Sequence, residues 1–319
     1  MARIAYLGPE GTFTEAALLQ ITGAGLVPEQ GPDGLQPLSI DSTPAALDAV
    51  RDGEADYACV PIENSIDGSV TPTLDSLSMG SPLQVFAETT QDITFNIVVK
   101  GGRSAADIRT LAAFSVASAQ VRRWVAANLA NAELRPAYSN GDAARQVAEG
   151  QADAAVTSPL AATHWGLDTL ADGVVDEPNA RTRFVLVGRP GPPPARTGAD
   201  RTSVVLRIDN APGALLAALA EFGIRGIDLT RIESRPTRTG LGTYVFFADC
   251  VGHIDDDAVA EALMALHRRC DDVRYLGSWP MGSPAGVIPP PADEASRWLA
   301  ELREGGSDET PEQAGGFAS

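Results

Sequence analysis

The sequence predicts an α/β fold with two parts. The larger N-terminal part has a largely parallel sheet or two small sheets, and the smaller part is a ferredoxin-like βαββαβ unit. Two observations support this prediction. Short apolar runs alternate with helical patterns through residues 1–190, as they do in α/β folds. Three consecutive prolines mark residues 191–200 as an extended linker, and a different order of elements follows it.

In the N-terminal part, apolar runs and helical patterns follow one another closely. Thr43-Pro44 and Thr71-Pro72 each put a hydroxyl before a proline, which is typical of a first helical turn. Strands are expected at 3–7, 57–62, 83–88, 93–99, 112–116, 153–156 and 183–187. Helices are expected near 13–22, 43–52, 71–78, 104–110, 118–130, 141–150 and 158–166.

Residues 201–280 follow the βαββαβ order. Strands are expected at 204–208, 227–234, 243–249 and 273–276, with helices at 214–222 and 255–270. Residues 281–319 are expected to form a C-terminal tail. Within it, residues 294–304 could form one amphipathic helix, and the polar remainder is expected to be disordered.

Composition excludes several kinds of partner and mechanism. A formal charge of −18 repels nucleic-acid phosphates and anionic lipid, and no apolar run is long enough to cross a membrane. Cys59, Cys250 and Cys270 are far apart, and no signal peptide precedes the first expected strand, so we expect a cytoplasmic protein with reduced thiols. Lys100 is the only lysine, and no metal-binding motif is present. We therefore expect neither a metal nor a cofactor, and chemistry based on hydroxyls, carboxylates, amides and arginines.

Polar residues follow three expected strands of the N-terminal part. In the loop at residues 8–14, backbone N–H groups near Gly11 and Thr12 could bind a carboxylate at a helix N-terminus, or Thr12 could simply cap that helix. The loop at residues 61–69 contains Glu63, Asn64 and Ser65, and is either a ligand-binding strand end or a polar surface loop.

The third stretch, residues 179–184, combines Thr182 with Arg183, whose guanidinium could hold a carboxylate bidentately; the alternative is a strand residue and a solvated arginine. In the second part, two stretches could together hold an amino acid, or could be a turn and a strand end. Their residues are Gly213, Ala214, Leu215 and Leu216, then Glu233, Ser234, Arg235 and Pro236.

Taken together, these stretches resemble the prephenate dehydratase family, particularly its mycobacterial and actinobacterial members. Residues 201–280 resemble an ACT domain, with 213–216 and 233–236 in the places of its phenylalanine-binding motifs. One departure is that Ala117-Ser118-Ala119-Gln120 stands where many members have Ser-His-Pro-Gln, so no histidine role is carried over. The resemblance rests on residues 6–13, 60–70, 154–158, 161–162, 166–167, 176, 179 and 182–184.

The resemblance implies a catalytic domain of two lobes, like a periplasmic binding protein. Lobe one would comprise about residues 1–78 and 180–190, and lobe two about residues 79–179. The implied reaction converts prephenate to phenylpyruvate, water and carbon dioxide. Phenylalanine would regulate it through the ACT domain of a homo-oligomer.

The reaction needs a donor to the departing hydroxyl and a cleft that orients the substrate. We expect Thr182 to be that donor, with Arg183, Gly11 and Thr12 on the substrate carboxylates and Glu63 as an orienting group. The other candidate contacts are Asn64, Ser65, Ser158 and Phe184, the last with packing as its first role. Two alternatives stay open at this point: an amino-acid sensor without chemistry, and a dehydratase specific for arogenate.

Overall fold

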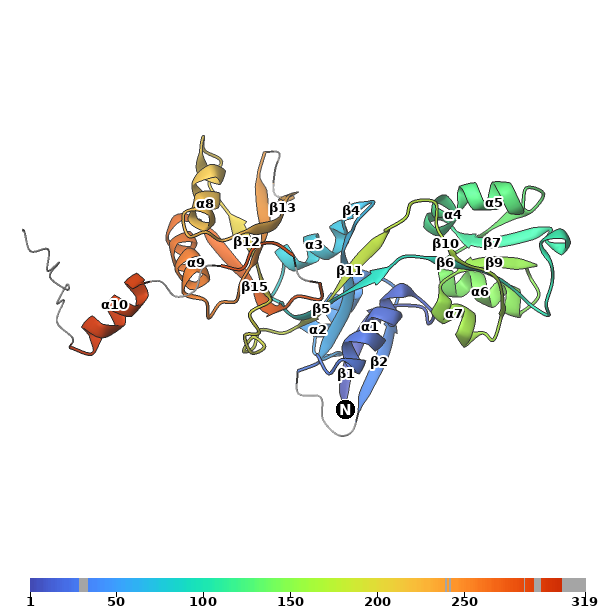
Figure 1. Ribbon diagram of the computed structural model, residues 1–319, viewed down its shortest axis with the longest axis horizontal. Helices are drawn as coiled ribbons and strands as arrows, with labels where there is room; N and C mark the ends of the chain where they lie inside the picture. The colour runs from blue at the N-terminus through green and yellow to red at the C-terminus, as the bar shows by residue number, and fades with distance from the viewer. Residues whose placement is uncertain (29–33, 239, 241, 284, 290–293, 306–319) are drawn as a thin grey trace, which may run out of the picture.

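The computed structural model describes residues 1–28, 34–238, 240, 242–283, 285–289 and 294–305. Three sheets follow one another along the long axis of the molecule (Figure 1). We call the parts built on them lobe one, lobe two and the C-terminal domain. Within the described parts of the chain, no helix is long and apolar enough to span a membrane.

Lobe one is built on a sheet with the order β2-β1-β3-β11-β5, with β4 paired to β3. β1 runs parallel to β2 and β3, whereas β11 is antiparallel to both of its neighbours. Its elements are β1 (Ala2–Leu7), α1 (Phe13–Gly23), β2 (Leu35–Ile40), α2 (Thr43–Arg51), β3 (Tyr57–Asn64), β4 (Gly68–Ser69), α3 (Thr71–Ser78), β5 (Gln84–Asp92) and β11 (Arg181–Gly188).

Lobe two has the sheet order β10-β6-β9-β7-β8. The helix expected at 104–110 is only a short 3-10 turn, because the backbone amides of Arg109 and Thr110 both donate to the Asp153 carboxylate and begin a strand. Strands β8 and β10 were not predicted. The elements are β6 (Phe95–Val99), η1 (Ala105–Asp107), β7 (Thr110–Phe114), α4 (Ser115–Gln120), α5 (Arg122–Asn128), β8 (Glu133–Ala137), α6 (Asn140–Ala148), β9 (Ala154–Thr157), α7 (Pro159–His164) and β10 (Asp168–Val174).

The chain passes between the two lobes twice. β5 belongs to the sheet of lobe one and β6 to that of lobe two, so the first crossing lies at residues 92–95. The family resemblance led us to predict it near residues 78–80; the correction follows from the pairing of β5 with β11. The return crossing lies between Val174 and Arg181, in the region where we expected it.

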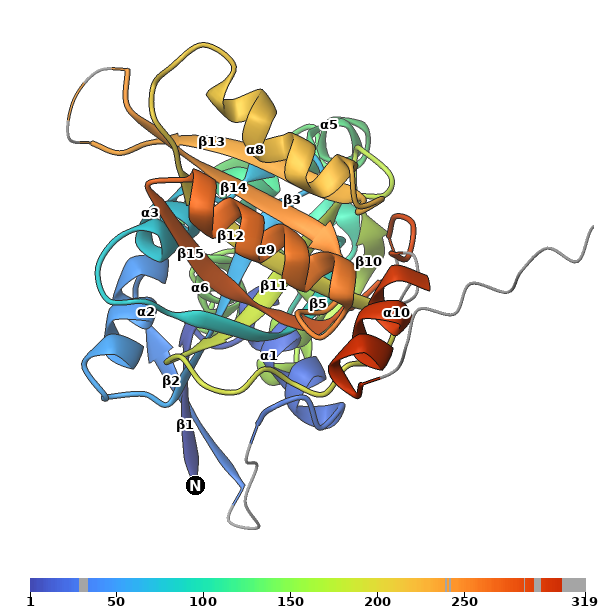
Figure 2. The ribbon, with the colours of Figure 1, turned by 90° about the vertical axis from the view of Figure 1, so that its left-hand side faces the viewer.

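The C-terminal domain has an antiparallel sheet of order β13-β14-β12-β15. Figure 2 shows α8 and α9 side by side on one face of this sheet, with lobe one behind it. The elements are β12 (Asp200–Arg207), α8 (Ala214–Gly223), β13 (Leu229–Pro236), β14 (Tyr244–Val251), α9 (Asp257–Arg269), β15 (Asp272–Pro280) and the separate α10 (Glu294–Arg303). The disorder that we predicted for the tail concerns mainly residues 306–319, which lie outside the described residues.

The face of the C-terminal sheet opposite its helices packs on lobe one and forms a common core with it. Leu276, Phe247 and Trp279 are fully buried there against lobe-one residues such as Val85 and Leu74. The indole Nε1 of Trp279 also donates to Glu88 of β5 over 3.0 Å. Lobe one and the C-terminal domain therefore exclude water from one continuous apolar core.

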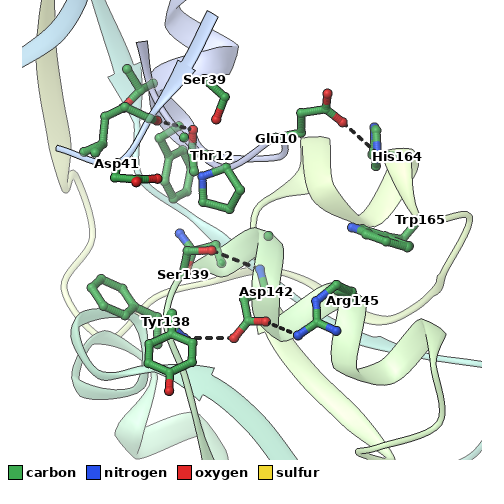
Figure 3. Close-up of a pocket in the computed structure, with 18 residues that line it drawn as sticks. Glu10, Thr12, Ser39, Asp41, Tyr138, Ser139, Asp142, Arg145, His164 and Trp165 are labelled. Atoms are coloured by element: carbon green, nitrogen blue, oxygen red, sulfur yellow. Dashed lines mark hydrogen bonds and ion pairs between the residues drawn. The ribbon is translucent and has the colours of Figure 1, made fainter. Parts of the chain in front are cut away.

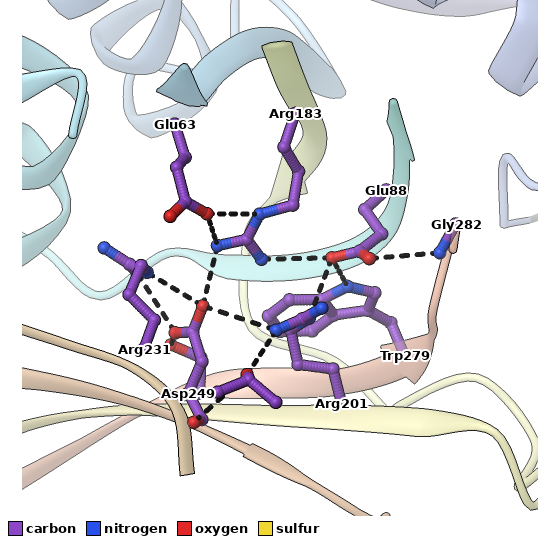
Figure 4. A network of polar contacts seen from close by, with 10 residues as sticks. Glu63, Glu88, Arg183, Arg201, Arg231, Asp249, Trp279 and Gly282 are labelled. Atoms are coloured by element: carbon purple, nitrogen blue, oxygen red, sulfur yellow. Dashed lines mark hydrogen bonds and ion pairs between the residues drawn. The ribbon is translucent and has the colours of Figure 1, made fainter. Parts of the chain in front are cut away.

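Charged groups cross the same joint (Figure 4). Glu88 of β5 accepts hydrogen bonds from Arg183 and Arg201 at 3.1 Å each, and the backbone N–H of Gly282 donates to its other oxygen at 3.0 Å. At the edge of the joint, Arg235 of β13 contacts Asp75 of α3 with two hydrogen bonds, of 2.8 and 3.1 Å. These contacts pair charges that burial would otherwise make costly.

We expect Gly277→Ala to loosen this joint. Gly277 has φ +130°, and a Cβ there would lie 2.4 Å from the carbonyl oxygen of Val85 on β5. Strain and the backbone clash together should lower the free energy of unfolding by about 2 kcal/mol or more, measured by urea denaturation. Gly223→Ala is the control, because a Cβ at Gly223 meets no atom within 4 Å. Equal denaturation midpoints for the two variants would contradict this packing.

The Arg235–Asp75 contact predicts a specific pH dependence. Hydrogen bonds from Arg235 and Arg238, acting against burial, hold the pKa of Asp75 below its usual value. The pair therefore stabilises the fold fully above the unfolded-state pKa of about 4, and this stabilisation is lost as the pH falls through the lower folded-state pKa. Asp75→Asn should reduce the free energy of unfolding by about 1–3 kcal/mol at pH 7.

The deficit of Asp75→Asn relative to the unmodified protein should shrink as the pH is lowered below about 4. Asp48→Asn serves as the control, because Asp48 is 59% exposed and pairs with Arg51 at the surface. Its effect should stay within about 0.5 kcal/mol at every pH. Denaturation midpoints of the three proteins between pH 3 and pH 7 make the comparison, and a pH-independent Asp75→Asn deficit would rule out the linkage.

Candidate active site

A cavity of about 870 Å³ lies where lobe one faces lobe two (Figure 3). The loop after β1 and the end of β2 form its lobe-one wall, and the N-terminus of α6 with the end of α7 forms the other. Glu10 and His164 face each other across it, with Oε2 and Nε2 3.2 Å apart. Its polar lining includes Thr12, Ser39, Asp41, Asn140, Asp142 and Arg145.

The lobes touch beside this cavity. The Ser158 hydroxyl donates to the carbonyl oxygen of Gly11 and accepts from the N–H of Ala161 at 3.0 Å, so it both joins the lobes and caps α7. Glycine is required on both sides, because a Cβ on Gly11 would lie 2.6 Å from Ala161 and one on Gly141 would lie 2.2 Å from the Glu10 carbonyl oxygen. Ser158 is therefore a closing contact between the lobes rather than an open ligand position.

The loop after β1 uses its donors within the protein. The N–H of Gly11 donates to the Glu15 carboxylate, and the Thr12 hydroxyl accepts from Glu15 N at 3.3 Å and donates to the Leu7 carbonyl at 3.1 Å. Of the two interpretations of this loop, the structure favours the helix cap. The Gly11 N–H and the Thr12 hydroxyl are thus paired within the protein, and binding of a substrate carboxylate by the N–H groups of this loop stays a prediction.

Thr182, the second residue of β11, lies opposite Asn64, the last residue of β3. The Asn64 side-chain amide donates to Thr182 Oγ1 at 2.8 Å. Asn64 Oδ1 accepts the backbone N–H groups of Ile66 and Asp67 at 2.8 and 2.9 Å, which fixes the orientation of the amide. Because Thr182 Oγ1 accepts this bond, its own proton is directed to another acceptor.

Ser65, next to Asn64, joins the 64–67 loop to the return crossing. Its hydroxyl accepts from Arg181 N at 2.9 Å and donates to the Asn179 carbonyl at 3.3 Å. These bonds keep the 64–67 loop against β11. Ser65 thus supports the Thr182–Asn64 pair, and its hydroxyl is occupied by backbone groups.

A second cavity, of about 550 Å³, borders the 64–67 loop between the lobes. Ile66 and Asp67 form its lobe-one side, and Gln120 and Arg122 contribute to the side from lobe two. Gln120 Oε1 is buried and has no hydrogen-bond partner among the described residues. Thr182 itself is 8% exposed and lines neither cavity in this closed arrangement.

The structure corrects the roles predicted for Arg183 and Phe184. Arg183 is 7% exposed and turns into the joint with the C-terminal domain, where Glu63, Glu88 and Asp249 occupy its guanidinium. Burial acts to lower the Arg183 pKa, but these carboxylates raise it, so the group stays charged. Phe184 is buried in the core of lobe one. Neither side chain is available to a substrate in the cleft.

The two candidate stretches of the C-terminal domain lie toward the same end of it. A hydrogen bond of 3.2 Å from Asn210 to the Gly242 carbonyl joins the turn before 213–216 to the hairpin that follows 233–236. Gly213 precedes α8 with φ 82°, and Leu216 is 73% exposed on its first turn. Residues 233–236 lie on β13, an edge strand. Arg235 is engaged with Asp75 of lobe one, which the sequence did not indicate.

Sequence reasoning also missed Glu88, Arg201, Arg231 and Asp249, which form most of the charged joint. For Asp249 the signal in the sequence is a charged residue between apolar ones, Ala248 and Cys250, within an expected strand. Such a residue predicts a buried partner of opposite charge, although it does not say which one.

The comparisons with known proteins match this architecture. A model of the prephenate dehydratase family matches residues 4–192, and an ACT domain model matches residues 202–268. A prephenate dehydratase of Mycobacterium avium (strain 104) is 84% identical over 305 residues, which cover 96% of this chain and 97% of that protein. A prephenate dehydratase of Mycobacterium leprae (strain Br4923) is 79% identical over 318 residues, covering 99% of each chain.

Among solved structures, a prephenate dehydratase from Arthrobacter aurescens in complex with L-Phe is similar to this chain. The TM-score is 0.82 with 42% identity, and the match covers 95% of this chain and 98% of the other. The two-lobed α/β fold with a ferredoxin-like ACT domain, predicted from the sequence, is confirmed. On the strength of these matches, the chain belongs to the prephenate dehydratase family.

Proposed function

We propose that the protein catalyses the decarboxylating dehydration of prephenate to phenylpyruvate in the cleft between the lobes. The family membership and the hydroxyl of Thr182, which is held in one orientation at the crossover, support this function. The reaction is driven by aromatisation, and its barrier lies in the departure of the ring hydroxyl. A precisely held hydrogen-bond donor is the catalytic group that this barrier calls for.

We assign the donor role to Thr182. Asn64 donates to its oxygen, which directs the hydroxyl proton outward and stabilises the negative charge that grows on Oγ1 as the proton is shared with the leaving group. A neutral hydroxyl also suits a dianionic substrate, because a carboxylate donor would lose its proton at neutral pH and repel it. Glu63 pairs with Arg183. We assign it an orienting role, in which it acts through Arg183 and does not contact the substrate.

Substrate carboxylates then need partners other than Arg183 and Gly11. The two cavities offer Arg145 in the larger and Arg122 in the smaller. We propose the smaller cavity as the substrate position, because it borders the loop that begins at Asn64. Gln120, whose buried Oε1 lacks a partner among the described residues, is there the expected polar contact.

We propose that phenylalanine regulates the enzyme through the C-terminal domain, at residues 213–216 and 233–236. The ACT match and the L-Phe complex of the Arthrobacter aurescens relative support this. An exposed edge strand β13, with Ile232 47% exposed, the exposed Leu216 on α8 and the exposed Ile224 directly after it support assembly of a homo-oligomer through these domains. The three free thiols support a cytoplasmic location.

Turnover of prephenate by the purified full-length protein, followed through the absorbance of phenylpyruvate, tests the proposed function. Arogenate in a parallel assay defines the substrate preference. Absence of phenylpyruvate formation from prephenate at micromolar enzyme would refute the proposal.

Thr182→Ala should lower kcat by about 100-fold or more, with a smaller change in KM, because the donor acts mainly in the transition state. Thr182→Ser retains the hydroxyl, so its kcat should stay within about tenfold of the unmodified enzyme. Steady-state kinetics of both variants make the comparison. A Thr182→Ala enzyme with near-normal kcat would show that another group is the donor.

Asn64→Asp tests whether the hydroxyl proton of Thr182 points toward the substrate. A carboxylate at this position accepts from Thr182 rather than donating to it, so the hydroxyl proton turns away from the substrate. We expect kcat to fall by about tenfold or more. Asp52→Asn is the control, because Asp52 is an exposed residue at the C-terminal end of α2 and lines neither cavity.

Glu233→Gln should weaken regulation. If Glu233 binds the ammonium group of phenylalanine, loss of its charge should raise the half-effective phenylalanine concentration by about tenfold. Glu261→Gln, which changes an exposed residue of α9, should keep the normal response. Phenylalanine titrations, each normalised to turnover without effector, provide the measurement. An unchanged Glu233→Gln titration would remove this residue from the effector site.

A further inference from the structure

The side chain of Arg183 connects three strands that are far apart in the sequence. Its Nη2 donates to Glu63 of β3 at 2.9 Å and to Asp249 of β14 at 2.8 Å, and its Nη1 donates to Glu88 of β5 at 3.1 Å. Figure 4 shows the guanidinium between the carboxylates of the two domains. Asp249 is therefore the group of the C-terminal domain that contacts the arginine next to Thr182 directly.

The register of β3 and β11 links the Asp249–Arg183 contact to Thr182, the candidate donor. In the β3–β11 ladder, Arg183 is opposite Glu63, and Thr182 is opposite Asn64. Successive residues of a strand point to opposite faces, so the Arg183–Glu63 pair faces the joint while the Thr182–Asn64 pair belongs to the next position of the same ladder. The position of Arg183 thus sets the position of Thr182 through one peptide unit.

Asp249 is held rigidly enough to act as a reference point. It accepts two hydrogen bonds from Arg231, of 2.9 and 3.0 Å, and one from Ser203 at 2.7 Å. Its side chain is 1% exposed. Burial acts to raise the Asp249 pKa, but Arg231, Arg183 and Arg201 lower it strongly, so the carboxylate keeps its charge. A buried, fully paired carboxylate defines one geometry for its partners.

We propose that Asp249, a residue of the ACT domain, is a positioning residue for the reaction: through Arg183 it holds the start of β11, and so the Thr182 hydroxyl, in the productive place. This inference rests on the proposed role of Thr182. It differs from a purely structural role, because a residue that serves only to dock the two domains would change stability without changing turnover in the folded enzyme.

Asp249→Asn in the full-length enzyme is the direct test. The neutral amide keeps the shape but loses the charge that holds Arg183, so kcat should fall about tenfold to hundredfold, as a misplacement of about 1 Å can produce. KM should stay within about threefold, since the substrate contacts proposed above lie elsewhere. Circular dichroism confirms in the same preparation that the variant is folded.

Arg274→Gln is the matched control. Arg274 crosses the same joint from β15, donating to the carbonyl oxygens of Leu77, Met79 and Gly80 at 2.9–3.1 Å, but it does not contact β3 or β11 through these bonds. Its kcat should stay within about twofold of the unmodified enzyme. An equal loss of kcat in Arg274→Gln and Asp249→Asn would mean that docking as such, and not Asp249, determines turnover, and would overturn the proposal.

Arg231→Lys decides the matter if Asp249→Asn does not fold. Lysine keeps the positive charge beside Asp249 but cannot make the bidentate pair of hydrogen bonds that the guanidinium makes. We expect a fall in kcat of about threefold or more with a native circular dichroism spectrum. A folded Arg231→Lys or Asp249→Asn enzyme with kcat within about twofold of the unmodified enzyme would overturn the proposal.

Hydrogen exchange gives a second measurement that does not depend on prephenate. In a folded variant of the Asp249–Arg231 pair, peptides covering residues 60–66 and 180–186 should exchange faster than in the unmodified protein, while β1 should not change. Unchanged exchange in both peptides would overturn the proposal. Failure of the unmodified protein to convert prephenate would instead refute the proposed function, and the exchange comparison would still test whether Asp249 holds β11.

Discussion

The arrangement of this protein depends on the buried ion pairs between Arg183 and the carboxylates of two domains. Charged groups removed from water are tolerated only when they are fully paired. Asp249, Glu88 and Glu63 meet that requirement for Arg183 by approaching it from β14, β5 and β3. Asp249 comes from the C-terminal sheet, whereas Glu88 and Glu63 come from the sheet of lobe one. All three carboxylates therefore reach Arg183 only when the two sheets are placed as they are here. The pairing fixes the C-terminal domain on lobe one and at the same time fixes the first residues of β11, which include Thr182.

As a consequence, lobe one is joined more extensively to the C-terminal domain than to lobe two. Lobe one and the C-terminal domain share an apolar core that includes Trp279 and Phe247. Lobe two is linked to lobe one by the two crossing segments and by contacts such as Ser158 to Gly11. Separating the lobes would break polar contacts and the edge-on packing of Phe13 on Phe95, whereas undocking the C-terminal domain would expose a larger shared core. Thr182 and Asn64 therefore belong to the rigid side, and lobe two is the part whose movement can admit a substrate.

The chemistry follows from the orientation of one amide. Asn64 accepts two backbone N–H groups and donates its side-chain amide to Thr182, so the hydroxyl proton of Thr182 is left for another acceptor. In the proposed mechanism no strong acid is needed, because aromatisation drives the reaction. The proposal requires a donor whose position does not change while the leaving group departs, and it assigns that role to Thr182.

The sequence by itself determined the fold class and the βαββαβ plan of residues 201–280, because periodicity and turn residues are local properties. It also singled out Thr182 as the candidate donor, a role that stays a prediction. The family resemblance implied a crossing near residues 78–80, whereas the structure has it at residues 92–95, since strand pairing is not local. Only the tertiary structure decided which charged side chain faces the cleft. Arg183 is adjacent to Thr182 in the chain but lies among Asp249, Glu88 and Glu63, because alternate residues of a strand face opposite sides and the buried acids come from distant segments.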